Sequence, residues 1–136
     1  MSVVVLVGRI LFCALMINNA YNHFSNGKML SAYAKSKRVP MPEVAVFVGG
    51  VLLGLGGLSV LLGVWADLGS LMLAIFLIPT AVLIHDFWRA GPEEKMSETV
   101  HFFKDTALAG ASLMMLGLFS IAGDDLGLTL TGPLFH

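Results

Sequence analysis

Charged residues are scarce in this sequence, and their scarcity narrows the class of protein. Only 12% of the 136 residues are Asp, Glu, Lys or Arg, whereas 57% are hydrophobic; soluble domains carry about 25% charged residues. A disordered chain, which is rich in charge and poor in apolar residues, is excluded. Because the net charge is −1 and no basic stripe is present, we expect no nucleic-acid partner. The composition predicts a small protein embedded in a lipid bilayer.

Cysteine is almost absent as well, since Cys13 is the only one in the chain. A disulfide within the chain, a CxxC redox pair and a thiolate zinc cluster are therefore excluded. Cys13 lies within the first apolar run, and we expect it to be a small apolar residue of the core.

Four apolar runs are long enough to cross a bilayer, which takes about 20 helical residues. They are continuous rather than alternating, so transmembrane strands are a poor alternative. The first run has no basic residue ahead of it and no good cleavage site after it, so we interpret it as a retained helix. We expect an all-α fold with one domain over residues 1–136, an up-down-up-down four-helix membrane bundle. The predicted spans cover approximately residues 3–21, 43–65, 68–88 and 99–122.

Basic residues are distributed unevenly between the two ends of the predicted bundle. Only Arg9 lies at the end that holds both termini. The other basic residues lie in the first connection (Lys28, Lys35, Lys37 and Arg38), in the third connection (Arg89 and Lys95) or just inside the fourth span (Lys104). Since basic loops stay on the cytoplasmic side, we expect both of these connections to be cytoplasmic and both termini to lie outside. Residues 28–35 carry Met29, Leu30 and Tyr33 on one side, which predicts a short interfacial helix with lysines facing anionic headgroups.

Small residues form a stripe on two of the predicted helices. Gly50, Gly54 and Gly57 share a face of the second span. The fourth span has a similar face, formed by Ala107, Gly110 and Ala111. Such faces allow close helix packing in lipid, either within the bundle or against a partner subunit.

Polar residues gather at the cytoplasmic ends of three predicted spans, where ionisable groups are costly unless they have partners. They are Asn22 and His23 in the first, His85, Asp86 and Trp88 in the third, and His101, Lys104 and Asp105 in the fourth. An antiparallel bundle can bring them to one membrane depth. Residues of these types are also ordinary anchors at the membrane interface, so structural polar packing is one interpretation.

Two chemistries fit the same residues if they form a site. A quinone headgroup needs an imidazole or lysine donor, a titratable group for proton uptake, and aromatic walls such as Phe87, Trp88, Phe102 and Phe103. A metal ion is the weaker alternative, with His23, His85 and His101 as ligands, because no HxxxH spacing is present.

Several segments together form a recognisable pattern. They are Gly8-Arg9, Asn22-His23-Phe24, Val39-Pro40-Met41-Pro42, the glycine-rich second span, His85-Asp86-Phe87-Trp88, and Phe103-Lys104-Asp105 with the residues up to Gly110. This pattern resembles the DoxX family over nearly the whole chain. The resemblance implies a four-helix protein of the bacterial or archaeal cytoplasmic membrane, often associated with oxidoreductase systems. Members include small subunits of thiosulfate:quinone oxidoreductase and components of thiol-stress complexes.

Three functions remain open from the sequence. The first is a membrane subunit of an oxidoreductase complex, rather than an autonomous enzyme, that binds quinone at the polar cluster without a covalent cofactor. The second is a non-catalytic assembly or anchor subunit that contacts other membrane subunits or a second copy of itself. A small oligomeric carrier or channel is the third and weakest, because no inverted repeat or pair of broken helices is visible.

Overall fold

The structure is a computed structural model that describes residues 1–135. This part of the chain contains five helices. They are α1 (Ser2–Ser25), α2 (Gly27–Ser36), α3 (Pro42–Leu62), α4 (Ala66–Leu83) and α5 (Lys95–Ala122). All except α2 are long and apolar enough to cross a membrane. The predicted all-α membrane fold, with a short helix after the first span, is confirmed.

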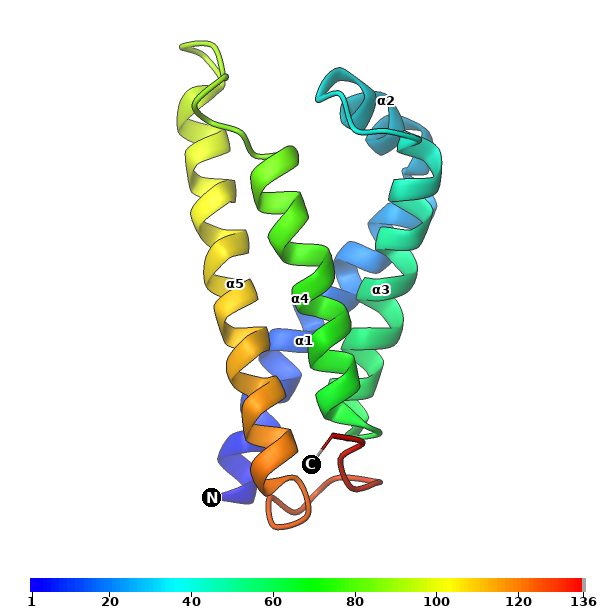
Figure 1. Cartoon of the computed structure of the whole chain (residues 1–136), viewed down its shortest axis with the longest axis vertical. Helices are drawn as coiled ribbons and strands as arrows, with labels where there is room; N and C mark the ends of the chain where they lie inside the picture. The colour runs from blue at the N-terminus through cyan, green and yellow to red at the C-terminus, as the bar shows by residue number, and fades with distance from the viewer. Residues whose placement is uncertain (136) are drawn as a thin grey trace.

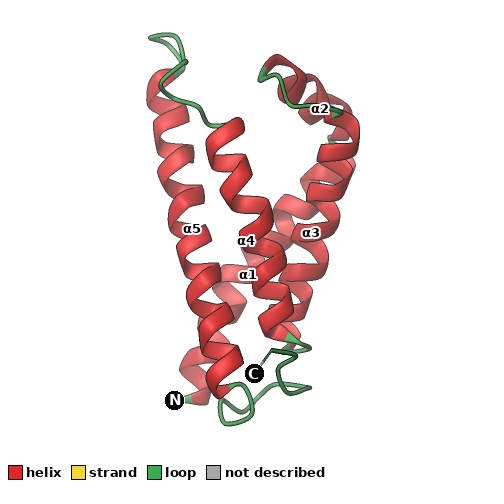
Figure 2. Ribbon diagram, viewed as in Figure 1, coloured by secondary structure: helices red, strands yellow, loops and turns green. Residues whose placement is uncertain are grey.

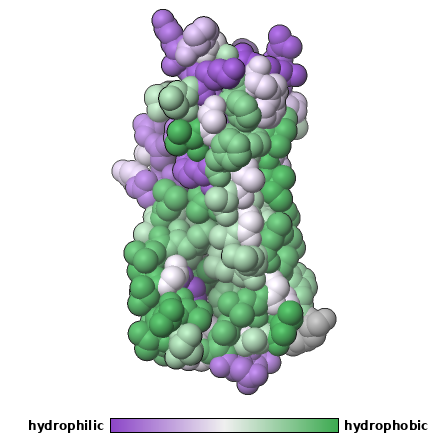
Figure 3. Space-filling view, turned by 90° about the vertical axis from the view of Figure 1, so that its left-hand side faces the viewer, coloured by the Kyte–Doolittle hydropathy of each residue, from purple (hydrophilic) through white to green (hydrophobic). Residues whose placement is uncertain are grey.

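The long helices pack in the order α1, α3, α4, α5, and α2 rests mainly on the start of α3. Figures 1 and 2 show the α2 segment and the α4–α5 connection at one end of the molecule and both chain ends at the other. We call these the α2 end and the terminal end. The surface in Figure 3 is apolar along most of its length and hydrophilic at the two extremities, as a membrane protein requires. Cys13 is buried in the core, as expected.

The glycines of α3 allow two neighbours to approach it closely. A Cβ added at Gly57 would lie 3.3 Å from Met16 and Ile17 of α1, and one at Gly54 would lie 3.6 Å from Ala20. On another face of α3, a Cβ at Gly56 would lie 2.9 Å from the carbonyl oxygen of Gly69 in α4. In lipid, such close van der Waals packing is a main source of association between helices. The predicted stripe, with Gly50 against His23 and Phe24, therefore faces α1 within the chain.

Two of the three residues in the small-residue face predicted for α5 lie on the surface, whereas Ala111 is half-buried. Ala107 and Gly110 are exposed, and a Cβ added at Gly110 would meet nothing within 4 Å. The buried residues of α5 are Glu98, Asp105, Ala109, Ser112 and Phe119. Side-chain size therefore identified the wrong face for packing inside the bundle, because polar partners and Phe119 set the rotation of α5.

Two helices end before the predicted spans do. The third span was expected to reach Trp88, but α4 ends at Leu83, and the backbone N–H groups of Ile84 and His85 both bond to the carbonyl of Thr80. The next residues, among them Phe87 and Trp88, turn toward α2 and α5, where the carboxylate of Asp86 bonds to the ammonium of Lys37. The second span was expected to reach Trp65, but α3 ends at Leu62 because Gly63 adopts a left-handed conformation with φ 68°.

The chain after α5 folds back across the terminal end as a strap, which we define as residues 124–135. The guanidinium of buried Arg9 donates to the carbonyls of Val60 and Leu61 at the end of α3 and to Leu128 of the strap, at 2.7–2.8 Å. A carboxylate oxygen of Asp67, whose residue is 0% exposed, accepts from the backbone N–H groups of Leu134 and Phe135. Both buried charges are thus bound by backbone atoms that hold the strap in place.

Candidate functional site

Eight polar side chains meet at the α2 end, and we call them the polar network. They are Tyr33, Lys37, His85, Asp86, Glu98, His101, Lys104 and Asp105. Three segments far apart in the sequence contribute them: α2 with the residue after it, the α4–α5 connection, and the first turns of α5. Burial of Asp86, Glu98 and Asp105 makes partners obligatory, because an unpaired buried carboxylate is very costly.

The contacts with α2 come from Lys37 and Tyr33. The ammonium of Lys37 bonds to Asp86 Oδ1 at 2.7 Å and lies 3.8 Å from Glu98 Oε1. Burial alone would lower the pKa of Lys37, but the hydrogen bond to Asp86 and the nearby negative charges raise it above its ordinary value. The hydroxyl of Tyr33 donates to Glu98, and burial together with this bond raises the pKa of Tyr33 to about 12.

His85 joins two carboxylates of α5. Its Nδ1 lies 2.9 Å from Glu98 Oε2, and its Nε2 lies 3.6 Å from Asp105 Oδ2. An imidazolium can direct both N–H groups at these oxygens, whereas the neutral ring can donate to only one of them. His85 therefore lies between two carboxylate acceptors of α5.

The network continues toward the surface through α5. The ring of His101 stacks on that of His85 with 5.0 Å between centroids, and its Nδ1 lies 3.2 Å from the ammonium of Lys104. Lys104 also lies 3.4 Å from Asp105 Oδ1, and 40% of its side chain is exposed. The polar network thus reaches from the buried carboxylates to the surface of α5.

An apolar cavity of about 360 Å³ lies between α2, α3 and α4 beside the polar network. We call it the α2–α3–α4 cavity. Most of its wall is aliphatic or aromatic, including Leu30, Val46, Phe76 and Leu83. Its polar members are His23, Tyr33, Thr80 and His85. Two members of the polar network, Tyr33 and His85, therefore reach a space of the kind that binds small apolar ligands.

The structure brings five of the predicted site residues into the polar network: His85, Asp86, His101, Lys104 and Asp105. His23 lies outside it, with Nδ1 bonded to the carbonyl of Asn19 at 2.8 Å and its ring edge-on to Phe76, although it shares the cavity wall with His85. Asn22 accepts a hydrogen bond from Asn26 at 2.6 Å and lines neither this cavity nor the neighbouring one beside α2.

The predicted aromatic walls also lie elsewhere. Trp88 is 52% exposed, and its ring packs edge-on against Phe87 and Phe102. Phe103 completes this aromatic group, none of which lines the α2–α3–α4 cavity. Because α4 ends before His85, the connection carries Phe87 and Trp88 onto α5 rather than into the space between helices.

No group of three or more His, Cys, Asp or Glu side chains within residues 1–135 is arranged to hold a metal ion. His85 and His101 stack face to face, while His23 contacts Phe76. The three histidines of the weaker alternative therefore do not present a common ligand set in the described structure.

Three members of the polar network were not among the predicted site residues: Tyr33, Lys37 and Glu98. Glu98 lies just before the predicted fourth span, although its spacing to His101 and Asp105 puts all three on one face of a helix. That spacing is the signal that could have found it, had α5 been expected to begin at Lys95. Nothing in the sequence pairs Tyr33 or Lys37 with residues more than forty positions later, since these contacts depend on where α2 lies.

A comparison with known protein families gives a match that extends over the first three spans and their connections. The DoxX family matches residues 4–86, more than half of the chain, and its match ends at Asp86. Glu98, His101, Lys104 and Asp105, with the rest of α5, thus lie outside the matched region. No curated protein and no solved structure matches the chain. With the matched segments forming α1 to α4 of a membrane bundle, the chain belongs to the DoxX family.

Proposed function

We propose that this DoxX protein is a quinone-interacting membrane subunit of an oxidoreductase system, with the quinone headgroup in the α2–α3–α4 cavity beside His85. The observation that carries the proposal is an apolar cavity whose wall includes His85, itself part of a network of titratable side chains. A quinone needs this combination, because its ring is apolar whereas its carbonyl oxygens need donors.

Access from the bilayer supports the proposal. The residues that line the cavity include Val48, Ile75 and Leu83, each about half exposed on the apolar surface of the helices. In a membrane this surface faces lipid chains, so a lipophilic molecule can enter sideways without crossing water. A small polar substrate would gain little from such a route.

The chemistry divides between this chain and its donor. Reduction of a quinone to a quinol takes two electrons and two protons. The electrons come from a redox centre in a partner subunit, and the protons come through the polar network. The Nε2–H group of His85, which is 3.6 Å from Asp105, donates a hydrogen bond to one quinone carbonyl and passes a proton to the quinone. Asp105 with Lys104 then restores the proton of His85, so that His85 delivers the second proton as well.

Quinone binding to the purified protein tests this proposal. A short-chain ubiquinone titrated into the detergent-solubilised chain should bind, and His85→Ala should weaken binding about tenfold through loss of one hydrogen bond. Lys104→Ala should weaken it less, because Lys104 acts through Asp105. Lys95→Ala is the control, since its exposed side chain lies outside the cavity and takes part in no ion pair of the described residues. Unchanged binding in both His85→Ala and Lys104→Ala would refute the site.

A second candidate function is that of an assembly subunit, and the uncovered face of α5 favours it. Ala107 and Gly110 present small side chains to the surroundings, with nothing within 4 Å of a Cβ added at Gly110. A neighbouring helix can pack closely there. Gentle detergent extraction should recover the chain with a membrane partner, and Gly110→Leu should release that partner. Recovery of a solitary, monodisperse chain would count against this function.

We also infer that the α2 end faces the cytoplasm, on the basis of its excess of Lys and Arg. In a Cys13→Ser background, Lys35→Cys should react with an impermeant maleimide only in inverted vesicles. Asp125→Cys, in the strap, should react in intact spheroplasts. The reverse pattern would overturn the orientation.

A further inference from the structure

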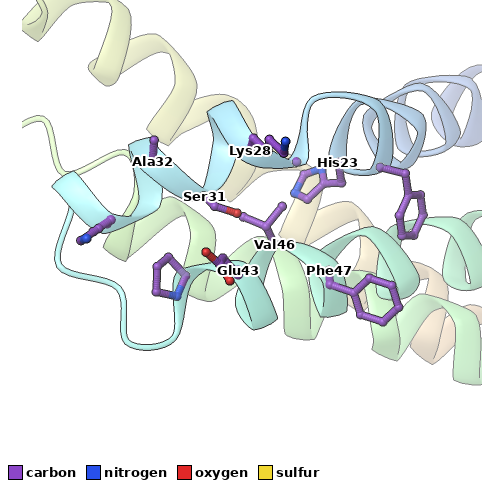
Figure 4. Close-up of a pocket in the computed structure, with 11 residues that line it drawn as sticks. His23, Lys28, Ser31, Ala32, Glu43, Val46 and Phe47 are labelled. Carbon is purple, nitrogen blue, oxygen red and sulfur yellow. The ribbon is translucent and has the colours of Figure 1, made fainter.

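A second cavity, of about 620 Å³, lies on the outer side of α2 and is separate from the polar network. The end of α1, one face of α2 and the start of α3 form its walls, as Figure 4 shows. His23 lines both this cavity and the α2–α3–α4 cavity, so its ring stands between them. We call the second space the α2 groove.

Two lysines form the basic side of the groove. Lys28 and Lys35 are seven residues apart on α2, which places them on one face two turns apart. Both are exposed, and neither takes part in an ion pair among residues 1–135. Lys37, by contrast, is held by Asp86. Lys28 and Lys35 are therefore free to bind an anionic group that enters the groove.

A carboxylate stands on the opposite side. Glu43, in the first turn of α3, points toward α2 near Ser31 in Figure 4. The described structure contains no ion pair for Glu43 either. The groove thus presents two ammonium groups and one carboxylate, all without partners in residues 1–135. A ligand with only a negative charge would leave Glu43 facing a like charge.

The floor of the groove is apolar and continues onto the lipid-facing surface. Val46 is buried there, while Phe24 and Phe47, packed edge-on with 5.9 Å between centroids, are more than half exposed. The groove therefore lies where the polar end of the molecule meets its apolar band. Lysines at this depth attract lipid phosphates, and aromatic rings at this depth contact the upper part of acyl chains.

We propose that the α2 groove binds one phospholipid whose headgroup carries both a phosphate and a primary ammonium group, such as phosphatidylethanolamine. Lys28 and Lys35 bind the phosphate, Glu43 binds the ammonium, and an acyl chain lies over Phe24 and Phe47. The charges on the two sides match such a headgroup and do not match a purely anionic one. This inference does not depend on quinone binding, because the groove and the α2–α3–α4 cavity share only His23 and Val46.

Native mass spectrometry of the full chain, released from nanodiscs of mixed composition, tests the proposal. With equal amounts of phosphatidylethanolamine, phosphatidylglycerol and phosphatidylcholine, the wild-type chain should retain one phosphatidylethanolamine preferentially. Lys28→Gln and Lys35→Gln should each reduce retention about fivefold, since a basic residue near lipid phosphates contributes about 1 kcal/mol. Lys95→Gln, another exposed lysine without an ion pair in the described structure, is the matched control.

Glu43→Gln separates the headgroup assignment from simple attraction to lysines. This variant should lose its preference for phosphatidylethanolamine and retain phosphatidylglycerol at least as well, because the opposing carboxylate is gone. The proposal fails if Lys28→Gln and Lys35→Gln retain lipid as Lys95→Gln does. It also fails if the wild-type chain prefers phosphatidylglycerol and Glu43→Gln changes nothing. Circular dichroism and size exclusion of every variant ensure that folded protein is compared.

Discussion

Both ends of this molecule bury charged side chains, but the two ends give them different partners. At the terminal end, Arg9 donates to backbone carbonyls and Asp67 accepts from backbone N–H groups. At the α2 end, buried carboxylates are paired with side chains such as Lys37 and His85. Backbone groups cannot change their protonation, whereas imidazole and carboxylate groups can. The two ends therefore differ in what their buried charges hold: the backbone of the strap and of α3 at the terminal end, and other titratable side chains at the α2 end.

Removal of Arg9 should give the largest effect and should affect stability alone. Arg9→Met should lower the free energy of unfolding by about 4 kcal/mol, because buried carbonyls at the end of α3 and in the strap lose a charged donor. Unfolding in increasing SDS, followed by circular dichroism, measures this change. Lys95→Met is the control, since that side chain is exposed and takes part in no ion pair of the described residues. Loss of quinone binding in the folded fraction of Arg9→Met would contradict the division between the two ends.

At the other end, Glu98→Gln should lower stability by about 2 kcal/mol, since Lys37, His85 and Tyr33 all lose a charged partner. Unlike Arg9→Met, it should also weaken short-chain ubiquinone binding in protein that remains folded. A double-mutant cycle with His85→Ala isolates the coupling between the two residues. Strictly additive effects would show that the 2.9 Å contact carries no coupling.

Matched glycine substitutions compare the packing of the two ends. A Cβ at Gly63 would lie 2.7 Å from Thr129 and 2.8 Å from the guanidinium of Arg9, and its φ is 68°. Gly63→Ala should therefore cost about 2 kcal/mol, through strain and displacement of the strap. At the α2 end a Cβ at Gly27 would meet nothing within 4 Å, so Gly27→Ala should leave the SDS midpoint unchanged or slightly raised. If Gly63→Ala and Gly27→Ala lowered the SDS midpoint equally, the predicted difference in packing between the two ends would be wrong.

The smallest expected effect is a loss of the stability that Tyr33 contributes at the α2 end, at alkaline pH. Because the pKa of Tyr33 in the folded protein is raised to about 12, Tyr33 keeps its proton at pH values where the free side chain, with a pKa of about 10, has lost it. Its contribution to stability is fully present below pH about 10 and is lost as pH rises toward 12. Absorbance of tyrosinate at alkaline pH should show a late-titrating component that Tyr33→Phe removes. A wild-type curve identical to that of Tyr33→Phe after scaling would contradict the Tyr33–Glu98 bond.

Residue patterns predicted much of the fold and part of the site, for identifiable reasons. Hydropathy located four spans because the energetic cost of exposing the backbone to lipid imposes long apolar helices. It placed the end of α4 five residues too late, because Phe87 and Trp88 extend the apolar run while Thr80 accepts the terminal N–H groups. Small residues predicted a close helix contact for α3 but neither that α1 makes it nor the rotation of α5, since Gly110 is as small as Gly54 and yet faces outward.

For the candidate site, the patterns identified residues but not their connections. His85, Asp86, His101, Lys104 and Asp105 stand near span ends, and the polar network contains all five. The contacts with Tyr33 and Lys37 could not be predicted, because an interfacial helix has no fixed position along the bundle. His23 shows the opposite case, a plausible site residue whose Nδ1 is already occupied by the carbonyl of Asn19.

The scarcity and placement of charge in the sequence alone determined a membrane protein with four spans and its basic loops at one end. Those properties follow from the transfer of each residue between water and lipid, which depends on local composition. Only the tertiary structure decided which buried charges bind the backbone and which bind each other. It also decided that Lys37 is paired while Lys28 and Lys35 remain free to bind a ligand. These ion pairs and hydrogen bonds depend on how each helix is rotated and on the path of each loop. A hydrogen bond needs a short distance and a defined angle, and hydropathy specifies neither.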